Sequence, residues 1–228
     1  MLLYYNNMEE KYNKYKNKYL KLKNINNSKN KYLKLKGGND YINELFNIYP
    51  KIEYINSSNT HKYNTTYGEI HKDSIDYIFN LNKNHDTFID LGSGNGFSCF
   101  YAAFFENIKK CIGIELVKER HEKAISIKNN LNNFEEHINK VELINDDIFN
   151  ISLEEFNNNN VIIWVSNLLF SNELNNKLFE KLYNEINDNT IIFTSSKPNE
   201  HKLELIETFN LKMSWIDNSN VYMFKKNN

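Results

Sequence analysis

Asp90-Leu-Gly-Ser-Gly-Asn-Gly96 is the stretch of this 228-residue chain that decides its fold. Three of the seven glycines in the chain fall within it, directly after the apolar run 87–91. Glycines let a backbone turn sharply and approach a ligand closely. A glycine-rich turn between a buried strand and a helix is where many α/β proteins bind nucleotide-like ligands. The stretch therefore predicts a strand, a tight turn with a ligand above it, and a helix.

Strand and helix patterns alternate after this turn. Apolar runs predict strands at 87–91, 110–115, 140–144, 161–166 and 190–195, and helical spacing predicts helices at 96–106, 118–132 and 172–186. Two last strands are expected at 211–215 and 221–224, around the polar turn 217–220. Strictly alternating units form a parallel sheet covered by helices. The expected fold class is therefore α/β, with a Rossmann-like, mostly parallel seven-stranded sheet that ends in an antiparallel hairpin.

A basic arm precedes this domain. Residues 1–37 hold ten lysines against Glu9 and Glu10, a local net charge of +8. Because the whole chain has a formal net charge of −1, the remaining residues have a net charge of −9. A short heptad stripe runs through Met8, Tyr12, Tyr15, Tyr19 and Leu22. We expect either a helical appendage that packs on the body or pairs with a second copy, or an arm that contacts nucleic acid.

The arm also carries a repeat, because Lys-Tyr-Leu-Lys-Leu-Lys occurs at 18–23 and again at 31–36. This low-complexity segment resembles the N-terminal segments of proteins from large DNA viruses, which suggests a viral protein. A helical N-terminal lobe is expected over 38–85, with helices at 41–49 and 69–81, before the Rossmann-like domain at 86–228.

Cysteine use and hydropathy restrict the setting. Cys99 and Cys111 fall inside predicted core elements, and neither they nor the six histidines have the spacing of metal ligands. We therefore expect no metal site and no disulfide framework. No run of about 18 apolar residues occurs, so no membrane contact is expected. An intracellular protein fits best, in the nucleus or on host-cell chromatin, or else in a viral particle.

Acidic residues follow three of the predicted strands and suggest the ligand. Asp90 precedes the glycine turn, and a carboxylate there suits a cationic cofactor with a free amino group better than a pyrophosphate. Glu115 ends the second strand and can accept both hydroxyls of a ribose, and Asp147 follows the third strand, where it can bind an adenine amine. These positions favour S-adenosylmethionine over a dinucleotide, although a purely structural turn with surface acids remains an alternative.

Five short motifs occur in one order between about 63 and 224. They are Tyr67-Gly68-Glu69-Ile70, the turn Asp90 to Gly96, Val165-Ser166-Asn167-Leu168-Leu169-Phe170, Thr194-Ser195-Ser196-Lys197-Pro198, and Ser214-Trp215 followed by Tyr222. Together they resemble the non-SET histone lysine methyltransferases, the "disruptor of telomeric silencing" family, which methylate a core lysine of histone H-three. The resemblance agrees with the expected terminal hairpin, which is the usual ending of class I methyltransferases.

The resemblance implies a role for each matching residue of the cofactor site. Tyr67 and Glu69 would hold the methionine end of the cofactor, beside the turn with Gly92, Gly94 and Gly96. Glu115 would hold the ribose and Asp147 the adenine amine. Two positions depart from the family: Ile70 replaces a threonine beside the channel, and Ile148 replaces an aromatic residue that packs on the adenine.

The same resemblance implies a lysine channel. Asn167 would lie near the methionine group and shape the mouth of the channel, which Trp215 and Tyr222 would line, so the catalytic candidates are these three residues with Tyr67. An apolar, aromatic channel disfavours the ammonium form of a lysine and lowers its pKa, which prepares the amine for attack. Structural alternatives exist, since Asn167 could cap the following helix and the aromatic residues could belong to the core.

The sequence therefore predicts a protein-lysine methyltransferase that acts on a histone or nucleosome. Two other functions fit the same residues: a methyltransferase for nucleic acid or a small molecule, and a catalytically weak protein that binds chromatin through its arm.

Overall fold

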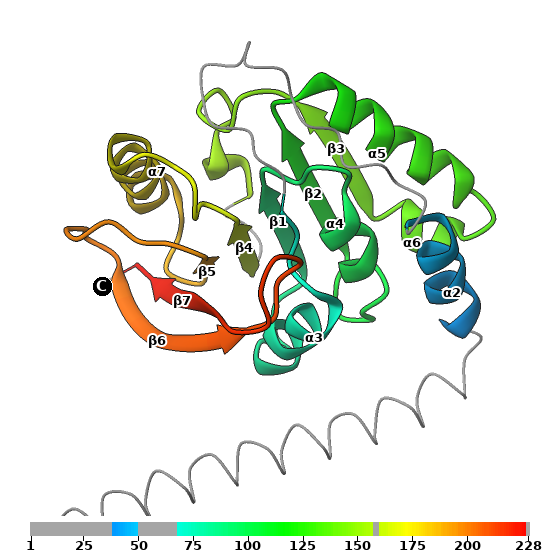
Figure 1. The fold of residues 1–228 in the computed structure, drawn as a ribbon, viewed down its shortest axis with the longest axis horizontal. Coiled ribbons are helices and arrows are strands. Elements are labelled where there is room, and N and C mark those ends of the chain that lie inside the picture. Colours follow the sequence, from blue (N-terminus) through cyan, green and yellow to red (C-terminus); the bar gives the residue numbers. More distant parts are fainter. Residues whose placement is uncertain (1–37, 50–67, 157–159, 227–228) are drawn as a thin grey trace, which may run out of the picture. The chain divides into compact units, whose positions relative to one another are not determined.

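The computed structural model describes residues 38–49, 68–156 and 160–226, and a seven-stranded sheet lies at its centre (Figure 1). Five strands are parallel: β1 (Thr87–Leu91), β2 (Lys110–Glu115), β3 (Val141–Asn145), β4 (Val161–Val165) and β5 (Ile191–Thr194). An antiparallel hairpin of β6 (Glu204–Leu211) and β7 (Ser219–Lys225) completes the sheet. The strand order is β3-β2-β1-β4-β5-β7-β6, which confirms the predicted fold class.

This order reverses direction beside β1. The chain leaves β1 for β2 and β3 on one side, and returns to β4 and β5 on the other. Loops from the two halves therefore diverge at the carboxyl ends of β1 and β4, which leaves a crevice where ligands bind in open α/β sheets. The glycine turn 92–96 lies at this point.

Two of the described helices precede β1, and the others lie between the strands. They are α2 (Gly38–Ile48), α3 (Lys72–Leu81), α4 (Phe97–Ala102), α5 (Lys118–Asn130), α6 (Glu135–Ile138), the short 3-10 helix η2 (Leu153–Phe156) and α7 (Asn172–Glu185). The side chains of His71 and Ser171 cap α3 and α7, each accepting a bond from a backbone N–H of the first turn. Among the residues that the structure describes, no helix is long and apolar enough to cross a membrane.

The register of the strands assigns each residue to one face of the sheet. Asp90 pairs with Trp164, and Trp164 with Phe193, so these side chains share a face. Phe79 of α3 packs against Phe88 on this face at 5.2 Å between ring centroids, and Ser98 of α4 bonds Asp90 there. The face of β1 that carries Asp90 is therefore the one covered by α3 and α4.

The opposite face holds the main apolar cluster under α7. Leu91 pairs with Val165, Val165 with Thr194, and Thr194 with Tyr222 across the sheet. On the same face, Phe224 is fully buried and makes an edge contact with Phe179 of α7 at 5.2 Å between ring centroids. Figure 1 shows α7 beside the β4, β5 and β7 part of the sheet, where it covers this cluster.

One predicted strand was misplaced. The strand expected at 211–215 lies at Glu204–Leu211 instead, and Met213 and Trp215 belong to the loop that follows it. β6 is the outer strand of the sheet, so most of its side chains are exposed, including Leu205 and Ile206, and the alternation that marks a strand is lost. The predicted turn 217–220 is also too long, because Ser219 and Asn220 already pair with β6.

A core substitution tests this packing. Phe224→Ala should lower the free energy of unfolding by about 3–5 kcal/mol, because it removes a fully buried ring between α7 and His201. Chemical denaturation measures the change. Ile216→Ala is the control, since that side chain is 52% exposed and should change stability by less than about 0.5 kcal/mol. Equal effects of the two substitutions would contradict the assigned core.

Candidate active site

The glycine turn closes against β2 through its backbone. Gly92, Gly94 and Gly96 have φ angles of 94°, 56° and 81°, a region that side chains with a Cβ rarely occupy. The N–H groups of Gly92 and Ser93 both donate to the Ile114 carbonyl, at 2.8 and 2.9 Å. A Cβ at Gly92 would have no atom within 4 Å, so the space above the turn is open to a ligand.

Glu115, at the end of β2, stabilises the same turn through hydrogen bonds of its carboxylate. One carboxylate oxygen accepts the Gly94 N–H at 2.7 Å, and the other accepts the Val117 N–H at 2.8 Å. The side chain is only 5% exposed, so these bonds compensate for the burial of its charge. Each carboxylate oxygen can accept a second bond. Glu115 can therefore hold the turn and a ribose together.

Asp90 is a buried acid, and one of its two carboxylate oxygens has no hydrogen-bond partner among the described residues. It is 4% exposed, and its Oδ2 accepts a short bond from the Ser98 hydroxyl. Its Oδ1 has no hydrogen-bond partner in the described part of the chain. Burial raises the pKa of Asp90 to about 7, against the opposing effect of the Ser98 bond, and the nearby charges of Glu115 and Glu69 raise it further. A cationic ligand beside Oδ1 would favour the ionised form.

Asp90 lines a small pocket formed by three parts of the chain. The segment 68–70 forms one wall, and the turn with Asp90, Gly92 and Ser93 forms the second. The third part is the end of β4, with Trp164 and Ser166. Phe97 and Ser98 of α4 also line the pocket. The pocket lies on the face of the sheet covered by α3 and α4, at the crevice beside the carboxyl ends of β1 and β4.

The segment 68–71 is held in place by the loop between β6 and β7. Ile70 forms an isolated antiparallel bridge with Met213. The Glu69 N–H donates to the Ser214 hydroxyl at 3.0 Å, and the Ser214 N–H donates to the Glu69 carbonyl at 2.8 Å. Residues about 145 positions apart in sequence therefore form one wall of the pocket.

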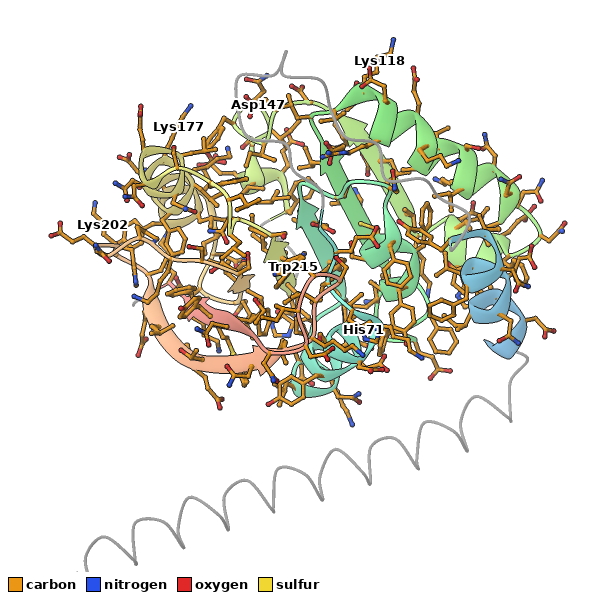
Figure 2. All side chains as sticks on the ribbon, viewed as in Figure 1. His71, Lys118, Asp147, Lys177, Lys202 and Trp215 are labelled. Atoms are coloured by element: carbon orange, nitrogen blue, oxygen red, sulfur yellow. The ribbon has the colours of Figure 1, made fainter. Side chains whose placement is uncertain are left out.

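Trp215 lies against this wall. A Cβ at Gly68 would approach two carbons of the Trp215 ring to 2.5 and 2.6 Å, so only a glycine leaves room for the ring. Trp215 lies on the β6–β7 loop (Figure 2). Its side chain is 40% exposed. Gly68, from the motif Tyr67 to Ile70, and Trp215, a predicted channel residue, are therefore brought together.

Glu69 also has a partner that the sequence did not suggest. Its carboxylate accepts a bond from the Tyr49 hydroxyl at 3.1 Å, and the Tyr49 ring makes an edge contact with Phe97 at 4.7 Å between centroids. Tyr49 lies at the end of α2, outside every recognised motif. Tyr67, one of the catalytic candidates, lies outside the described residues.

Asn167 does not line the pocket in the described residues. It is fully buried and bonds Asn175, Ser195 and Ser196, which connects the ends of β4 and β5 to α7. Sequence reasoning singled out the neighbouring asparagine and gave no role to Ser166, which does line the pocket. The alternation of β4 could have found it, because Ser166 lies two positions after Trp164.

Tyr222 and Trp215 lie in different places, and neither is among the described residues that line the pocket. Tyr222 pairs with Thr194 on the face of the sheet that α7 covers, whereas Trp215 lies beside Gly68 on the α3 side. The Lys197 ammonium lies 5.8 Å from the centroid of the Tyr222 ring. The face of this ring therefore already holds a lysine side chain.

The two candidates after β3 lie at the carboxyl end of that strand. Asp147 is half-buried, and its carboxylate accepts the Phe149 N–H at 3.0 Å, which forms a tight turn. Ile148 is buried in the main apolar cluster. Their contact with an adenine stays a prediction. In the described ranges, no group of three or more His, Cys, Asp or Glu is arranged to hold a metal ion.

The fold is that of the class I S-adenosylmethionine-dependent methyltransferases. A sequence model of the family described as "Histone methylation protein DOT1" matches residues 46–226, and the chain belongs to this family. The predicted family, enzyme class and methyl donor are thereby confirmed. Curated protein sequences give no significant match.

Several solved structures are similar to this chain at low sequence identity. A tRNA methyltransferase of B. subtilis, TrmK, has a TM-score of 0.51 at 13% identity, over 68% of this chain and 66% of that one. The mitomycin 7-O-methyltransferase MmcR has a TM-score of 0.49 at 8% identity, over 63% and 49% of the two chains. Variant MtNAS bound to S-adenosylmethionine has a TM-score of 0.47 at 12%, over 66% and 60%. This chain thus spans about half to two thirds of these proteins.

The residues at the site fit S-adenosylmethionine. The free Oδ1 of Asp90 is a buried acceptor that suits a cationic amino group. The space beside Gly92 is open, and Glu115 has acceptor capacity for ribose hydroxyls. When bound, this cofactor supplies an electrophilic methyl group on a sulfonium.

The packing of Trp215 can be tested at Gly68. Gly68→Ala should displace the indole, shift tryptophan fluorescence to longer wavelength and lower stability by about 1–3 kcal/mol, because the added methyl group overlaps the ring. The same substitution in a Trp215→Phe background is the control and should leave the emission of buried Trp164 unchanged. An unshifted spectrum in the single variant would contradict the contact.

The ionisation of Asp90 predicts a pH dependence of cofactor binding. The raised pKa of about 7 means that Asp90 is mostly neutral below pH 7, whereas a cationic ligand favours the carboxylate. Affinity for S-adenosylmethionine should therefore fall as pH is lowered from 7 to 5.5, by up to about tenfold per unit. Calorimetry measures this slope. Asp90→Asn should bind weakly and without the slope, whereas Asp86→Asn should behave as wild type; a pH-independent wild type would refute the assignment.

Proposed function

We propose that this chain transfers a methyl group from S-adenosylmethionine to a lysine of a core histone, in chromatin of the nucleus or a host cell. The observation that carries the proposal is the wall built by Gly68, Glu69 and Trp215 beside the glycine turn. It brings together motifs of the family from both ends of the matched region.

Methyl transfer to lysine makes simple demands on the protein. The amine must lose its proton, leave water and align with the methyl group. Aromatic side chains such as Trp215 and Tyr222 provide a desolvated path that disfavours the ammonium form without introducing a competing nucleophile. The Lys197 side chain lies 5.8 Å from the centroid of the Tyr222 ring, which supports the capacity of this ring to contact a lysine side chain.

Cofactor contacts follow from the same proposal. Glu69 and Asp90 would hold the methionine end, Glu115 the ribose, and Asp147 the adenine amine. Gly92, Gly94 and Gly96 would let the backbone approach the ligand. Tyr67 and Ile70 would border the methionine end, and Ile148 would lie beside the adenine.

The arm 1–37 belongs to the proposal as a second point of attachment. Its balance of +8 in 37 residues suits the phosphates of nucleosomal DNA, and counterion release would then contribute to binding. Pairing of two copies through the heptad stripe is the other use of this segment that its sequence supports.

Labelled methyl transfer tests the substrate and the channel together. Nucleosomes, free core histones, DNA and RNA are offered separately with labelled cofactor. We expect label on histone lysine, and Tyr222→Leu should lower kcat/KM at least about tenfold because the ring no longer holds the amine.

Tyr183→Leu is the matched control for this variant. Tyr183 also lies under two lysine ammoniums, at 5.2 and 5.5 Å from its ring centroid, but it belongs to α7 and lies outside the candidate site. It should keep wild-type activity. Label found only on nucleic acid, or equal losses in both variants, would refute the lysine assignment.

A further inference from the structure

Two neighbouring residues at the end of β4 face in different directions. Trp164 shares a face of the sheet with Asp90, and Val165 shares the other face with Leu91. Ser166 continues the direction of Trp164 and lines the pocket beside Asp90. Asn167 is 0% exposed and belongs to a separate buried network among the described residues.

The side chain of Asn167 is saturated with hydrogen bonds. Its Nδ2 donates to Asn175 Oδ1 at 2.6 Å and to the Ser196 carbonyl at 3.0 Å. Its Oδ1 accepts the Ser196 N–H at 2.9 Å and the Ser195 hydroxyl at 3.4 Å. An asparagine amide has two donors and two acceptor sites, so nothing is left for a cofactor or a substrate amine.

Asn175 holds this arrangement from α7. It is 4% exposed, and its Nδ2 donates to the Phe170 carbonyl at 3.2 Å while its Oδ1 accepts from Asn167. The backbone of Asn167 is tied as well, because the Phe170 N–H donates to the Asn167 carbonyl at 3.2 Å. The loop 166–170 is thus connected to α7 through Asn167 and Phe170, and to the segment after β5 through Asn167.

We propose that Ser166 is the residue of this loop that faces the reacting groups, and that Asn167 and Asn175 are positioning residues that hold it there. This inference rests on the proposed methyl transfer. It assigns to Ser166 the position near the methionine group of the cofactor, at the mouth of the lysine channel, that the sequence motif suggested for Asn167.

The chemistry of a serine suits this place. Its hydroxyl can accept a bond from an amine N–H or donate to a carboxylate, so it can orient a ligand without bringing a charge into the pocket. Without an adjacent base, a serine hydroxyl is a poor nucleophile near neutral pH, so it would not compete for the methyl group. Trp164 and Asp90 border the same space, so a side chain larger than serine would enter it.

The placement of Ser166 can be tested by binding alone, without a histone. Ser166→Phe should lower affinity for S-adenosylhomocysteine at least about tenfold in calorimetry, because the ring would fill the pocket, and Ser166→Ala should lower kcat about fivefold or more with an unchanged melting temperature. Asn176→Phe is the control, since Asn176 is the exposed neighbour of Asn175 on α7. Wild-type affinity in Ser166→Phe would overturn the assignment.

The positioning role needs a separate readout. Asn175→Leu should accelerate amide hydrogen exchange at Phe170 and Ser196 by at least about tenfold and lower kcat, with affinity for S-adenosylhomocysteine within threefold of wild type. Asn175→Gln keeps both an amide oxygen for Asn167 and an amide donor for the Phe170 carbonyl, and should restore part of the exchange protection and of kcat. Asn176→Leu should match wild type in every readout.

The outcomes separate this inference from the proposed function. A folded Asn175→Leu variant with wild-type exchange and kcat would refute the positioning role. If the wild type labels no histone, the proposed function fails, and the binding and exchange measurements still decide where Ser166 and Asn167 lie.

Discussion

The parallel pairing of β1 with both β2 and β4 is the constraint on which the rest of the site depends. Asp90 pairs with Gly113 on one side and Trp164 on the other, so the ends of three strands are fixed within one register. Gly113 has no room for a side chain, because a Cβ there would approach Ser93 to 2.8 Å. The glycine turn can therefore lie directly over β2, where the Ile114 carbonyl and the Glu115 carboxylate hold it.

The two buried acids at this point have different environments. Glu115 is satisfied by backbone N–H groups on both oxygens, whereas Asp90 has one hydroxyl partner and one oxygen without any. Burial of a carboxylate is unfavourable unless it is compensated, so Asp90 is the less stable anion. A cationic ligand would supply the missing interaction, which is why the fold suits a cofactor with a positive methionine end.

The hairpin of β6 and β7 has a second function besides closing the sheet. Thr194, the last residue of β5, pairs with Tyr222, and the hairpin continues beyond it to Leu211 and Ser219. Its loop then reaches back to the segment 68–71, more than 140 positions earlier in the chain. One extended hairpin thereby connects the wall beside the cofactor turn with the aromatic residues proposed to guide a lysine.

The sequence by itself determined the fold class, the five parallel strands and the glycine turn. These features depend on local apolar runs and on backbone positions with positive φ, which favour glycine. It misplaced β6, since an exposed edge strand loses its alternation and the loop residues Met213 and Trp215 gain apolar contacts from a distant segment. It also favoured Asn167 over Ser166. The alternation of β4 points toward Ser166, but the burial of Asn167 follows only from the tertiary structure, because its side chain bonds Asn175 and Ser196, which lie on other elements.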